Sequence, residues 1–174
     1  MNKILILGSS GSGKSTLANR LGKTFNIEVL HLDIIFWEEN WKICNKLVYL
    51  TELEEWLQKK QYIIDGNHNY GDSLKTRIVN ADTIIFLNYN RMVCLYGAIK
   101  RYFKYKNKTR PSMKQGCDEK IDFEFVKYIL WDYPKKKKKL IFPLIENEFK
   151  GQCHQFKTRK ALNKFIKKLG VMVE

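Results

Sequence analysis

The sequence has no long hydrophobic run, few acidic residues and no closely spaced cysteines. Its first aliphatic run is only "ILIL" at positions 4–7, whereas a membrane-spanning helix needs roughly 18 apolar residues. The same run is too short for the core of a signal peptide. We therefore expect a cytoplasmic protein that does not act at a membrane.

Paired cysteines are also missing. The four cysteines are scattered along the chain, and none belongs to a C-x-x-C pair: Cys44, Cys94, Cys117 and Cys153. This spacing excludes the common zinc-binding and redox motifs. We expect four reduced thiols in or near the core.

Acidic residues are scarce relative to basic ones. The chain of 174 residues has 32 Lys and Arg but only 18 Asp and Glu, which gives a formal charge of +14. Such a surplus favours anionic partners such as nucleotides, phosphorylated metabolites or nucleic acid. A hydrophobic share of 44% indicates a globular protein, and the length predicts one domain that spans residues 1–174.

Apolar runs alternate with helical patterns along the chain. Strands are expected at 3–8, 27–32, 61–66, 82–88 and 151–156, and helices at about 14–24, 50–57, 90–105, 123–131 and 158–169. This alternation predicts an α/β fold of three layers, in which a five-stranded parallel sheet is flanked by helices. Two segments do not fit the sheet, 33–45 and 105–121. We expect both beyond the carboxyl ends of the strands, where ligands bind.

The clearest motif is "GSSGSGKS" at positions 8–15. It matches the phosphate-binding loop G-x-x-x-x-G-K-[ST], and the expected strand and helix stand on either side of it. Glycines let backbone N–H groups surround a triphosphate, and the helix N-terminus adds its dipole. The residues predicted to bind ATP are Gly8, Ser10, Gly11, Ser12, Gly13, Lys14, Ser15 and Thr16. Lys14 would bridge the β- and γ-phosphates, Ser15 would bind Mg²⁺, and Thr16 would contact the α-phosphate.

Asp65 ends the third expected strand in "YIIDG". A carboxylate at this edge suits Mg²⁺, although Asp-Gly is also a common turn dipeptide. The next residues are Gly66 and Asn67 rather than the Glu with which many hydrolytic motors activate water. The guanine-reading N-K-x-D pattern is absent as well. The sequence therefore favours ATP over GTP, and phosphoryl transfer to a small acceptor over hydrolysis.

Asp33 is the residue predicted to contact the hydroxyl group of the phosphate acceptor. It follows the second expected strand in "HLD", where a carboxylate can orient or deprotonate an acceptor hydroxyl. The alternative is a helix N-cap. His31, two residues earlier, is expected to pack within its strand.

An aromatic segment follows Asp33. The acceptor-binding segment is expected at about 33–60, and its aromatic residues Phe36, Trp37 and Trp41 form either a stacking wall for a ring-shaped acceptor or a hydrophobic lid. We assign Asp65, Asn67 and Arg91 to the substrate site as well. No Arg lies between 33 and 60, which argues against an ordinary nucleoside monophosphate as acceptor.

No acidic residue lies between Arg91 and Cys117. Small P-loop kinases close a basic lid over the γ-phosphate, and we expect that lid at about 105–121. Its catalytic arginines are predicted to be Arg101 and Arg110, which would act with Lys14 and Asp33. Interleaved aromatic residues keep a nucleic-acid surface open as an alternative: Tyr96, Tyr102, Phe103 and Tyr105.

A run of five lysines, Lys135 to Lys139, follows Pro134. Five consecutive side chains point all round a helix and cannot all face one ligand. We expect a solvated turn here.

Several motifs together resemble the DNA topology modulation (FlaR-like) proteins, an adenylate-kinase-like P-loop family. The resemblance spans about residues 2–170, through "GSSGSGKSTLA", "YIIDGN", "IIFLNYNR", "KRYFKYKNKTRP", "GCDEKIDFEFVKYILWD" and "FKTRKALNKF". It implies a nucleoside-kinase-type sheet, ATP on the loop and a lid. The sequence lacks the monophosphate-clamping Arg of adenylate kinase and the Gly triplet of shikimate kinase, so neither substrate is implied.

These patterns predict an ATP-binding, Mg²⁺-dependent kinase that phosphorylates a small-molecule acceptor, with nucleoside- or nucleotide-like molecules among the candidates. Two alternatives stay open. One is an ATP-binding regulator that contacts nucleic acid, and the other is a slow ATPase that acts with a protein partner.

Overall fold

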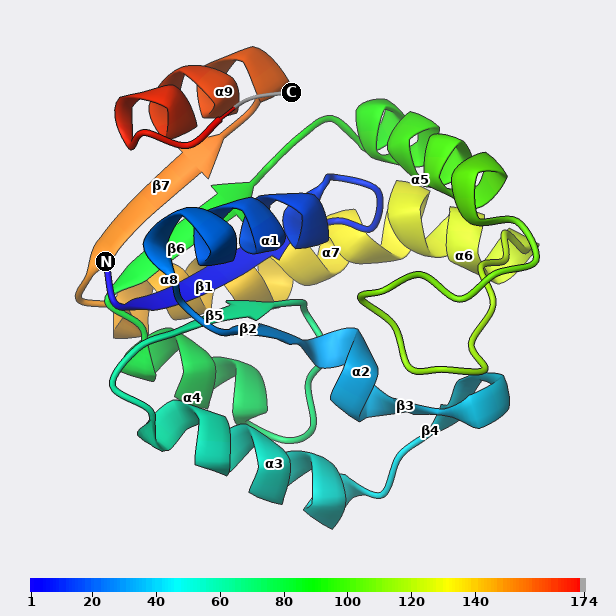
Figure 1. Ribbon diagram of the computed structural model, residues 1–174, viewed down its shortest axis with the longest axis horizontal. Coiled ribbons are helices and arrows are strands. Elements are labelled where there is room, and N and C mark those ends of the chain that lie inside the picture. The colour runs from blue at the N-terminus through cyan, green and yellow to red at the C-terminus, as the bar shows by residue number, and fades with distance from the viewer. Residues whose placement is uncertain (173–174) are drawn as a thin grey trace.

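A parallel sheet of five strands forms the centre of the computed structural model (Figure 1). Its strands are β1 (Lys3–Gly8), β2 (Val29–His31), β5 (Tyr62–Asp65), β6 (Thr83–Leu87) and β7 (Gln152–Phe156). Their order is β2-β5-β1-β6-β7, and every neighbouring pair is parallel. The structure describes residues 1–172, so the last two residues of the predicted domain lie outside the described residues. The predicted sheet of five parallel strands is confirmed, including the last strand, which was expected at 151–156.

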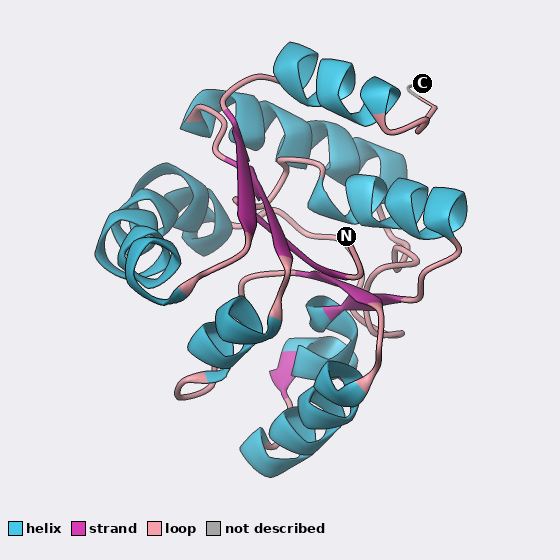
Figure 2. Ribbon diagram, turned by 90° about the vertical axis from the view of Figure 1, so that its left-hand side faces the viewer, coloured by secondary structure: helices cyan, strands magenta, loops and turns pink. Residues whose placement is uncertain are grey.

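Helices cover both faces of this sheet (Figure 2). One core contains α1 (Lys14–Phe25), α5 (Arg91–Tyr105) and α9 (Arg159–Lys168), and the other contains α3 (Lys46–Gln58), α4 (Ser73–Asn80) and α8 (Phe142–Glu148). Successive side chains of β1 enter opposite cores, Ile4 and Ile6 on one side and Leu5 and Leu7 on the other. Burial on both faces explains why this strand is a continuous apolar run.

The chain does not continue as a strand up to Asp33. After β2 come α2 (Leu32–Phe36), β3 (Trp37–Glu38), the 3₁₀ turn η1 (Glu39–Trp41) and β4 (Lys42–Ile43), and β3 pairs with β4 in a small antiparallel sheet. Asp33 therefore lies in the first turn of α2. Leu32 and Ile35 are buried and hold this short helix against the core, which is why the strand ends early.

The helical region after the lid extends much further than the predicted 123–131. It contains α6 (Phe123–Lys127), η2 (Tyr128–Asp132), α7 (Tyr133–Lys136), η3 (Lys137–Ile141) and α8, and η2 and η3 are π-helical. Pro134 lies just after η2, and Pro143 lies just after η3. Because proline cannot donate the usual backbone hydrogen bond, each of them interrupts the regular α-helical pattern. Even so, among residues 1–172 no helix is both long and apolar enough to cross a membrane.

The predicted solvated turn at Lys135–Lys139 is therefore wrong. Lysine is a good helix former, and buried Tyr133 and Ile141 anchor the helix on either side of the run. Two of the lysines are drawn inward: Lys136 Nζ donates to the Asn67 carbonyl at 3.0 Å, and Lys137 Nζ donates to Asn88 Oδ1 at 2.7 Å.

Three of the four cysteines are buried, as expected for reduced thiols in or near the core. Cys44 and Cys94 belong to the two hydrophobic cores, and Cys117 is buried in the lid, whereas Cys153 on the edge strand β7 is exposed. None of the four forms a disulfide.

Candidate active site

A cavity of about 910 Å³ opens beyond the carboxyl ends of the strands. Its volume lies near the top of the range that small-molecule sites occupy. Most predicted site residues line it: Ser10, Gly11, Ser12, Gly13, Lys14, Ser15, Thr16, Asp33, Phe36, Trp37, Trp41, Asp65, Asn67, Arg101 and Arg110. The cavity is lined by segments from Ser10 to Ile166 and thus brings together residues from nearly the whole chain.

The phosphate loop runs from the end of β1 to the first residue of α1. Gly13 caps this helix in the left-handed region, with φ of 94°, a conformation that glycine adopts without strain. Lys14 Nζ donates to the Ser9 carbonyl at 3.1 Å, and burial lowers the pKa of this ammonium group. The Ser12 hydroxyl is buried without a hydrogen-bond partner in the described residues. Such donors suit a ligand with phosphate oxygens.

The loop packs against the backbone of α5. A Cβ at Gly11 would lie 2.1 Å from the Cys94 carbonyl oxygen, and a Cβ at Gly97 would lie 2.1 Å from the Gly11 oxygen. Only glycine at both positions permits this approach. The sequence motif marks Gly11, but no local signal marks Gly97.

Asn67 braces the start of the loop. Its Nδ2 donates to the Gly8 carbonyl at 2.5 Å, and the Gly8 N–H donates to Asn67 Oδ1 at 3.4 Å. Asn67 lines the cavity, as expected for a substrate-binding residue. Its side-chain amide, however, already forms hydrogen bonds with the backbone of Gly8. Gly8 itself is not among the lining residues.

Asp65 ends β5 beside the loop. His31 Nδ1 donates to Asp65 Oδ2 at 2.9 Å, and His31 Nε2 lies 2.9 Å from Asn19 Oδ1. Asp65 Oδ1 is buried and has no hydrogen-bond partner among the described residues. No group of three or more His, Cys, Asp or Glu side chains within residues 1–172 is arranged to hold a metal ion. One carboxylate oxygen and the Ser15 hydroxyl are nevertheless the hard ligands that Mg²⁺ takes when phosphates supply the rest.

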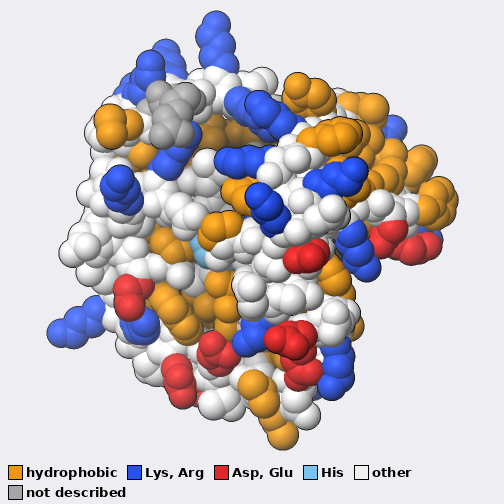
Figure 3. Space-filling model, turned by 45° about the vertical axis from the view of Figure 1, so that its right-hand side comes forward, with side chains coloured by type: hydrophobic (Ala, Val, Ile, Leu, Met, Phe, Trp, Pro, Cys, Tyr) orange, Lys and Arg blue, Asp and Glu red, His pale blue; other side chains and the backbone are white. Residues whose placement is uncertain are grey.

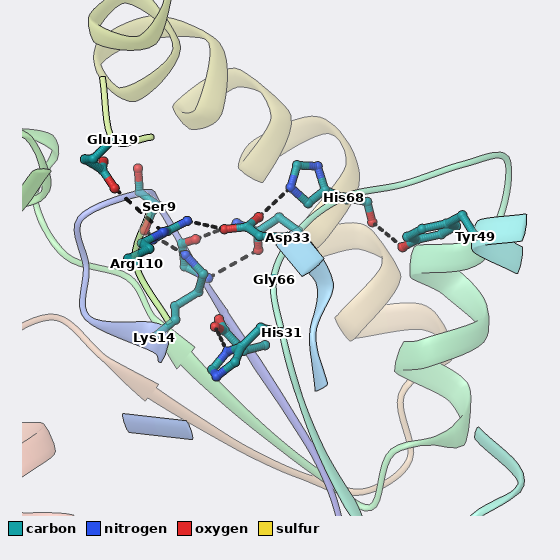
Figure 4. A network of polar contacts seen from close by, with 12 residues as sticks. Ser9, Lys14, His31, Asp33, Tyr49, Gly66, His68, Arg110 and Glu119 are labelled. Atoms are coloured by element: carbon teal, nitrogen blue, oxygen red, sulfur yellow. Dashed lines mark hydrogen bonds and ion pairs between the residues drawn. The ribbon is translucent and has the colours of Figure 1, made fainter. Parts of the chain in front are cut away.

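Asp33, which also lines the cavity, lies at the centre of a polar network (Figure 4). His68 Nε2 donates to Asp33 Oδ1 at 2.7 Å, and the Arg110 guanidinium pairs with Asp33 Oδ2. Glu119, only 6% exposed, lies 2.6 Å from Arg101 NH2 and 3.7 Å from Arg110 Nε. The buried Glu119 carboxylate therefore links the two predicted catalytic arginines to each other, and Arg110 pairs directly with Asp33.

This network sets the charge of Asp33. Burial alone raises the pKa of a carboxyl group, but the hydrogen bond from His68 and the positive charge of Arg110 more than offset it. The pKa of Asp33 is thereby held well below its usual range. Asp33 is therefore ionised at neutral pH, and suits the role of hydrogen-bond acceptor more than that of a strong base.

His68 is held from several sides. Its ring stacks on Phe36 with centroids 3.8 Å apart and an interplanar angle of 13°. Its carbonyl accepts hydrogen bonds from Arg77 and from the Tyr49 hydroxyl, the latter at 3.5 Å. Arg77 is 1% exposed and also donates to the Gly66 carbonyl at 3.2 Å. His68 was not predicted, because no local pattern marks a residue that pairs 35 positions away.

The aromatic segment contacts residues 117 and 118 of the segment predicted to form the lid. Trp37 and Trp41 meet edge to face at 5.4 Å, and Trp41 Nε1 donates to the Asp118 carbonyl at 3.1 Å. The Cys117 thiol donates to the Glu38 carbonyl at 3.1 Å. One face of Phe36 is already covered by His68. These contacts are those expected of a hydrophobic lid, while both tryptophans still line the cavity and remain able to contact an acceptor.

Four of the eight basic residues in the acid-free segment line the cavity. They are Lys100, Arg101, Lys104 and Arg110. In the upper part of the face in Figure 3 the charged side chains are Lys and Arg, beside a group of hydrophobic ones. The other four lie outside the cavity, and among these Arg91 is the one predicted to contact the substrate. Arg91 begins α5 and donates to the Leu130 carbonyl at 3.1 Å. Its position does not support the predicted substrate contact.

The fold is similar to solved structures of small-molecule kinases. Shikimate kinase from Acinetobacter baumannii in complex with shikimate is 17% identical, with a TM-score of 0.55 over 97% of this chain and 94% of that chain. Shikimate kinase from Bacteroides thetaiotaomicron is also 17% identical, with a TM-score of 0.55 over 95% and 94%. Deoxyadenosine kinase from M. mycoides, with products dCMP and dCDP bound, is 15% identical, with a TM-score of 0.50 over 96% and 97%.

Identities this low show the fold alone. No protein-family model and no curated protein matches the sequence. The predicted membership of the DNA topology modulation family is therefore not confirmed, whereas the predicted P-loop kinase fold is.

Proposed function

We propose that this protein transfers the γ-phosphate of MgATP to a hydroxyl group of a small-molecule acceptor. The observation that carries the proposal is the cavity itself, because the phosphate loop and the residues of the Asp33 network line the same cavity. Phosphoryl transfer needs little covalent chemistry from the protein and depends on bringing two substrates together in line. The kinases with the same fold support this interpretation.

The nucleotide side would be bound by the loop residues predicted from sequence, Gly8 and residues 10–16. Backbone N–H groups and the N-terminus of α1 would hold the phosphates, and the Lys14 ammonium would contact the β- and γ-phosphates. Ser15 and Asp65 would hold Mg²⁺, which suits the unpartnered Asp65 oxygen. When bound, Mg²⁺ supplies positive charge to the phosphate oxygens.

On the acceptor side, Asp33 would accept a hydrogen bond from the reacting hydroxyl and hold its oxygen toward the γ-phosphorus. That oxygen forms the new P–O bond, the bond from the γ-phosphorus to the bridging oxygen breaks, and ADP leaves. The hydroxyl proton goes to solvent through the polar groups at Asp33. Arg101 and Arg110 would stabilise the charge on the transferring group, for which a bidentate guanidinium is well suited.

The distribution of basic residues favours a lid over a nucleic-acid surface. Four of the eight cations in the acid-free segment line the cavity, among them both predicted catalytic arginines: Lys100, Arg101, Lys104 and Arg110. A nucleic-acid surface would place them on an outer face instead. A gel shift with a steep salt dependence would favour the other interpretation.

The test is ADP formation from ATP with a panel of hydroxyl acceptors. We expect at least one acceptor to raise the rate, and Lys14→Ala to lower that rate at least about 100-fold, because transition-state charge stabilisation is lost. Lys23→Ala is the matched control, because it removes an exposed lysine from the same helix. ATP binding without stimulation by any acceptor would contradict the proposal.

A further inference from the structure

One lysine of the five-residue run differs from the others. Among Lys135–Lys139, only Lys136 lines the large cavity. Lys137 bonds to Asn88 beside a separate, smaller cavity, and Lys135, Lys138 and Lys139 are exposed. The helix directs one ammonium group of the run into the candidate site, which the sequence pattern did not show.

Lys136 has a polar partner but no counter-ion. Its Nζ donates to the Asn67 carbonyl at 3.0 Å. The neighbouring cation Arg77 is almost completely buried, and its guanidinium donates only to the backbone carbonyls of Ser73, Gly66 and His68. Within residues 1–172, neither cation forms an ion pair with an Asp or Glu. Two cations thus lie near each other without a compensating anion.

This arrangement is unfavourable unless an anion binds. Burial lowers the pKa of Lys136, and the charge of Arg77 lowers it further. Partly buried cations in proteins are usually paired, because desolvation of a lone charge costs free energy. A carboxylate or phosphate beside Lys136 offsets that cost and gives a charge-assisted hydrogen bond.

The position of Lys136 indicates that the carboxylate or phosphate beside it belongs to the acceptor molecule rather than to ATP. Its partner Asn67 is followed by His68, which bonds to Asp33, the residue proposed to hold the reacting hydroxyl. The phosphates of ATP already have the loop and Lys14. Lys136 therefore lies where a second group on the acceptor can bind while the hydroxyl faces Asp33.

We propose that the acceptor is an anionic alcohol whose carboxylate or phosphate group binds at Lys136. This inference rests on the proposed kinase function and specifies its substrate class. It also revises the argument from the missing arginines between 33 and 60, because the cation that binds the acceptor comes from α7. Neutral alcohols and neutral nucleosides are expected to be poor acceptors.

A binding measurement separates this inference from the proposed function. The full chain is first saturated with a non-hydrolysable ATP analogue and Mg²⁺, so that the phosphate loop is filled. Inorganic phosphate and acetate are then titrated separately by calorimetry, as probes of the two anion classes. The variants are Lys136→Gln, which keeps a hydrogen-bond donor for Asn67, Lys136→Arg, which keeps the charge, and the exposed neighbour Lys135→Gln.

We expect one probe to bind the loaded protein and Lys136→Gln to weaken its binding at least about tenfold. Lys136→Arg should restore most of the affinity, and Lys135→Gln should match the wild type. The probe that binds identifies the anion class. No binding of either probe to the loaded protein would overturn the inference, and so would equal losses in Lys136→Gln and Lys135→Gln.

An activity measurement then uses acceptors that differ only in charge. ADP formation is compared for shikimate and its methyl ester, and for deoxyadenosine monophosphate and deoxyadenosine. Faster turnover with an anionic member, lost in Lys136→Gln through a higher KM, supports the inference. Faster turnover with a neutral member overturns it while the kinase function stands. If anions bind at Lys136 but no acceptor is phosphorylated, the kinase function fails and the anion site stands.

Discussion

The close contact between the phosphate loop and α5 makes Gly11→Ala an informative substitution. Gly11 has φ of +76°, and an added Cβ would lie 2.1 Å from the Cys94 carbonyl oxygen and 2.6 Å from the Ala98 nitrogen. Both atoms belong to the backbone of a helix, so no side-chain rotation can relieve the overlap. Either the loop or α5 has to move.

The expected cost has two parts. A residue with a Cβ in the left-handed region costs about 1–2 kcal/mol, and overpacking of a well-packed contact costs about 1–3 kcal/mol. Gly170→Ala is the matched control, because its φ is +75° and nothing lies within 4 Å of the added Cβ. Gly170→Ala should therefore show only the first part, and Gly11→Ala should lower the free energy of unfolding by about 1–3 kcal/mol more.

Urea unfolding followed by circular dichroism measures these differences, and calorimetry measures the affinity for a non-hydrolysable ATP analogue. Gly11→Ala should also weaken nucleotide binding at least about tenfold, because the loop N–H groups are displaced from the phosphates. Gly170→Ala should bind as the wild type does. Equal losses of stability in the two variants, with unchanged nucleotide binding in both, would refute the described contact between loop and helix.

Three further substitutions test the site. Asp65→Asn should raise the Mg²⁺ concentration for half-maximal ADP formation about tenfold or more; an unchanged Mg²⁺ titration contradicts the assignment. Glu119→Gln should lower the free energy of unfolding by about 3–5 kcal/mol in urea, since Arg101 and Arg110 lose their shared buried carboxylate; a neutral effect contradicts the network. Because the pKa of Asp33 is lowered in the fold, its stabilisation is present at neutral pH and is lost as the pH falls below about 4. Asp33→Asn should thus show a shallower loss of stability in acid than the wild type, and parallel curves would contradict this.

Much of the fold follows from local sequence patterns. Apolar runs mark strands that are buried on both faces, and the loop motif marks where β1 gives way to α1. The last helix begins where the sequence predicts it, and Thr158 caps it, because its hydroxyl accepts from the Ala161 N–H at 3.2 Å. Such features depend on neighbours within a few residues, so the sequence alone predicts them.

The missed features depend on residues far apart in the chain. His68 becomes a site residue only because α2 brings Asp33 and Phe36 to it. Gly97 becomes critical only where α5 touches the loop. The lysine run looks like a solvated turn by composition, but the burial of Tyr133 and Ile141 fixes it as a helix and turns Lys136 inward. In each case the role of the residue depends on tertiary packing, and no short sequence pattern encodes that packing.

The most direct test of the account is the fate of the γ-phosphate. The protein is incubated with γ-labelled ATP, Mg²⁺ and each acceptor of the panel, and the labelled products are separated. The account predicts that label passes from ATP to an organic phosphate ester of an anionic acceptor, in the wild type and in Lys23→Ala but not in Lys14→Ala. Label found only in inorganic phosphate, or label that never leaves ATP with any acceptor, would contradict the central claim that this site transfers a phosphoryl group.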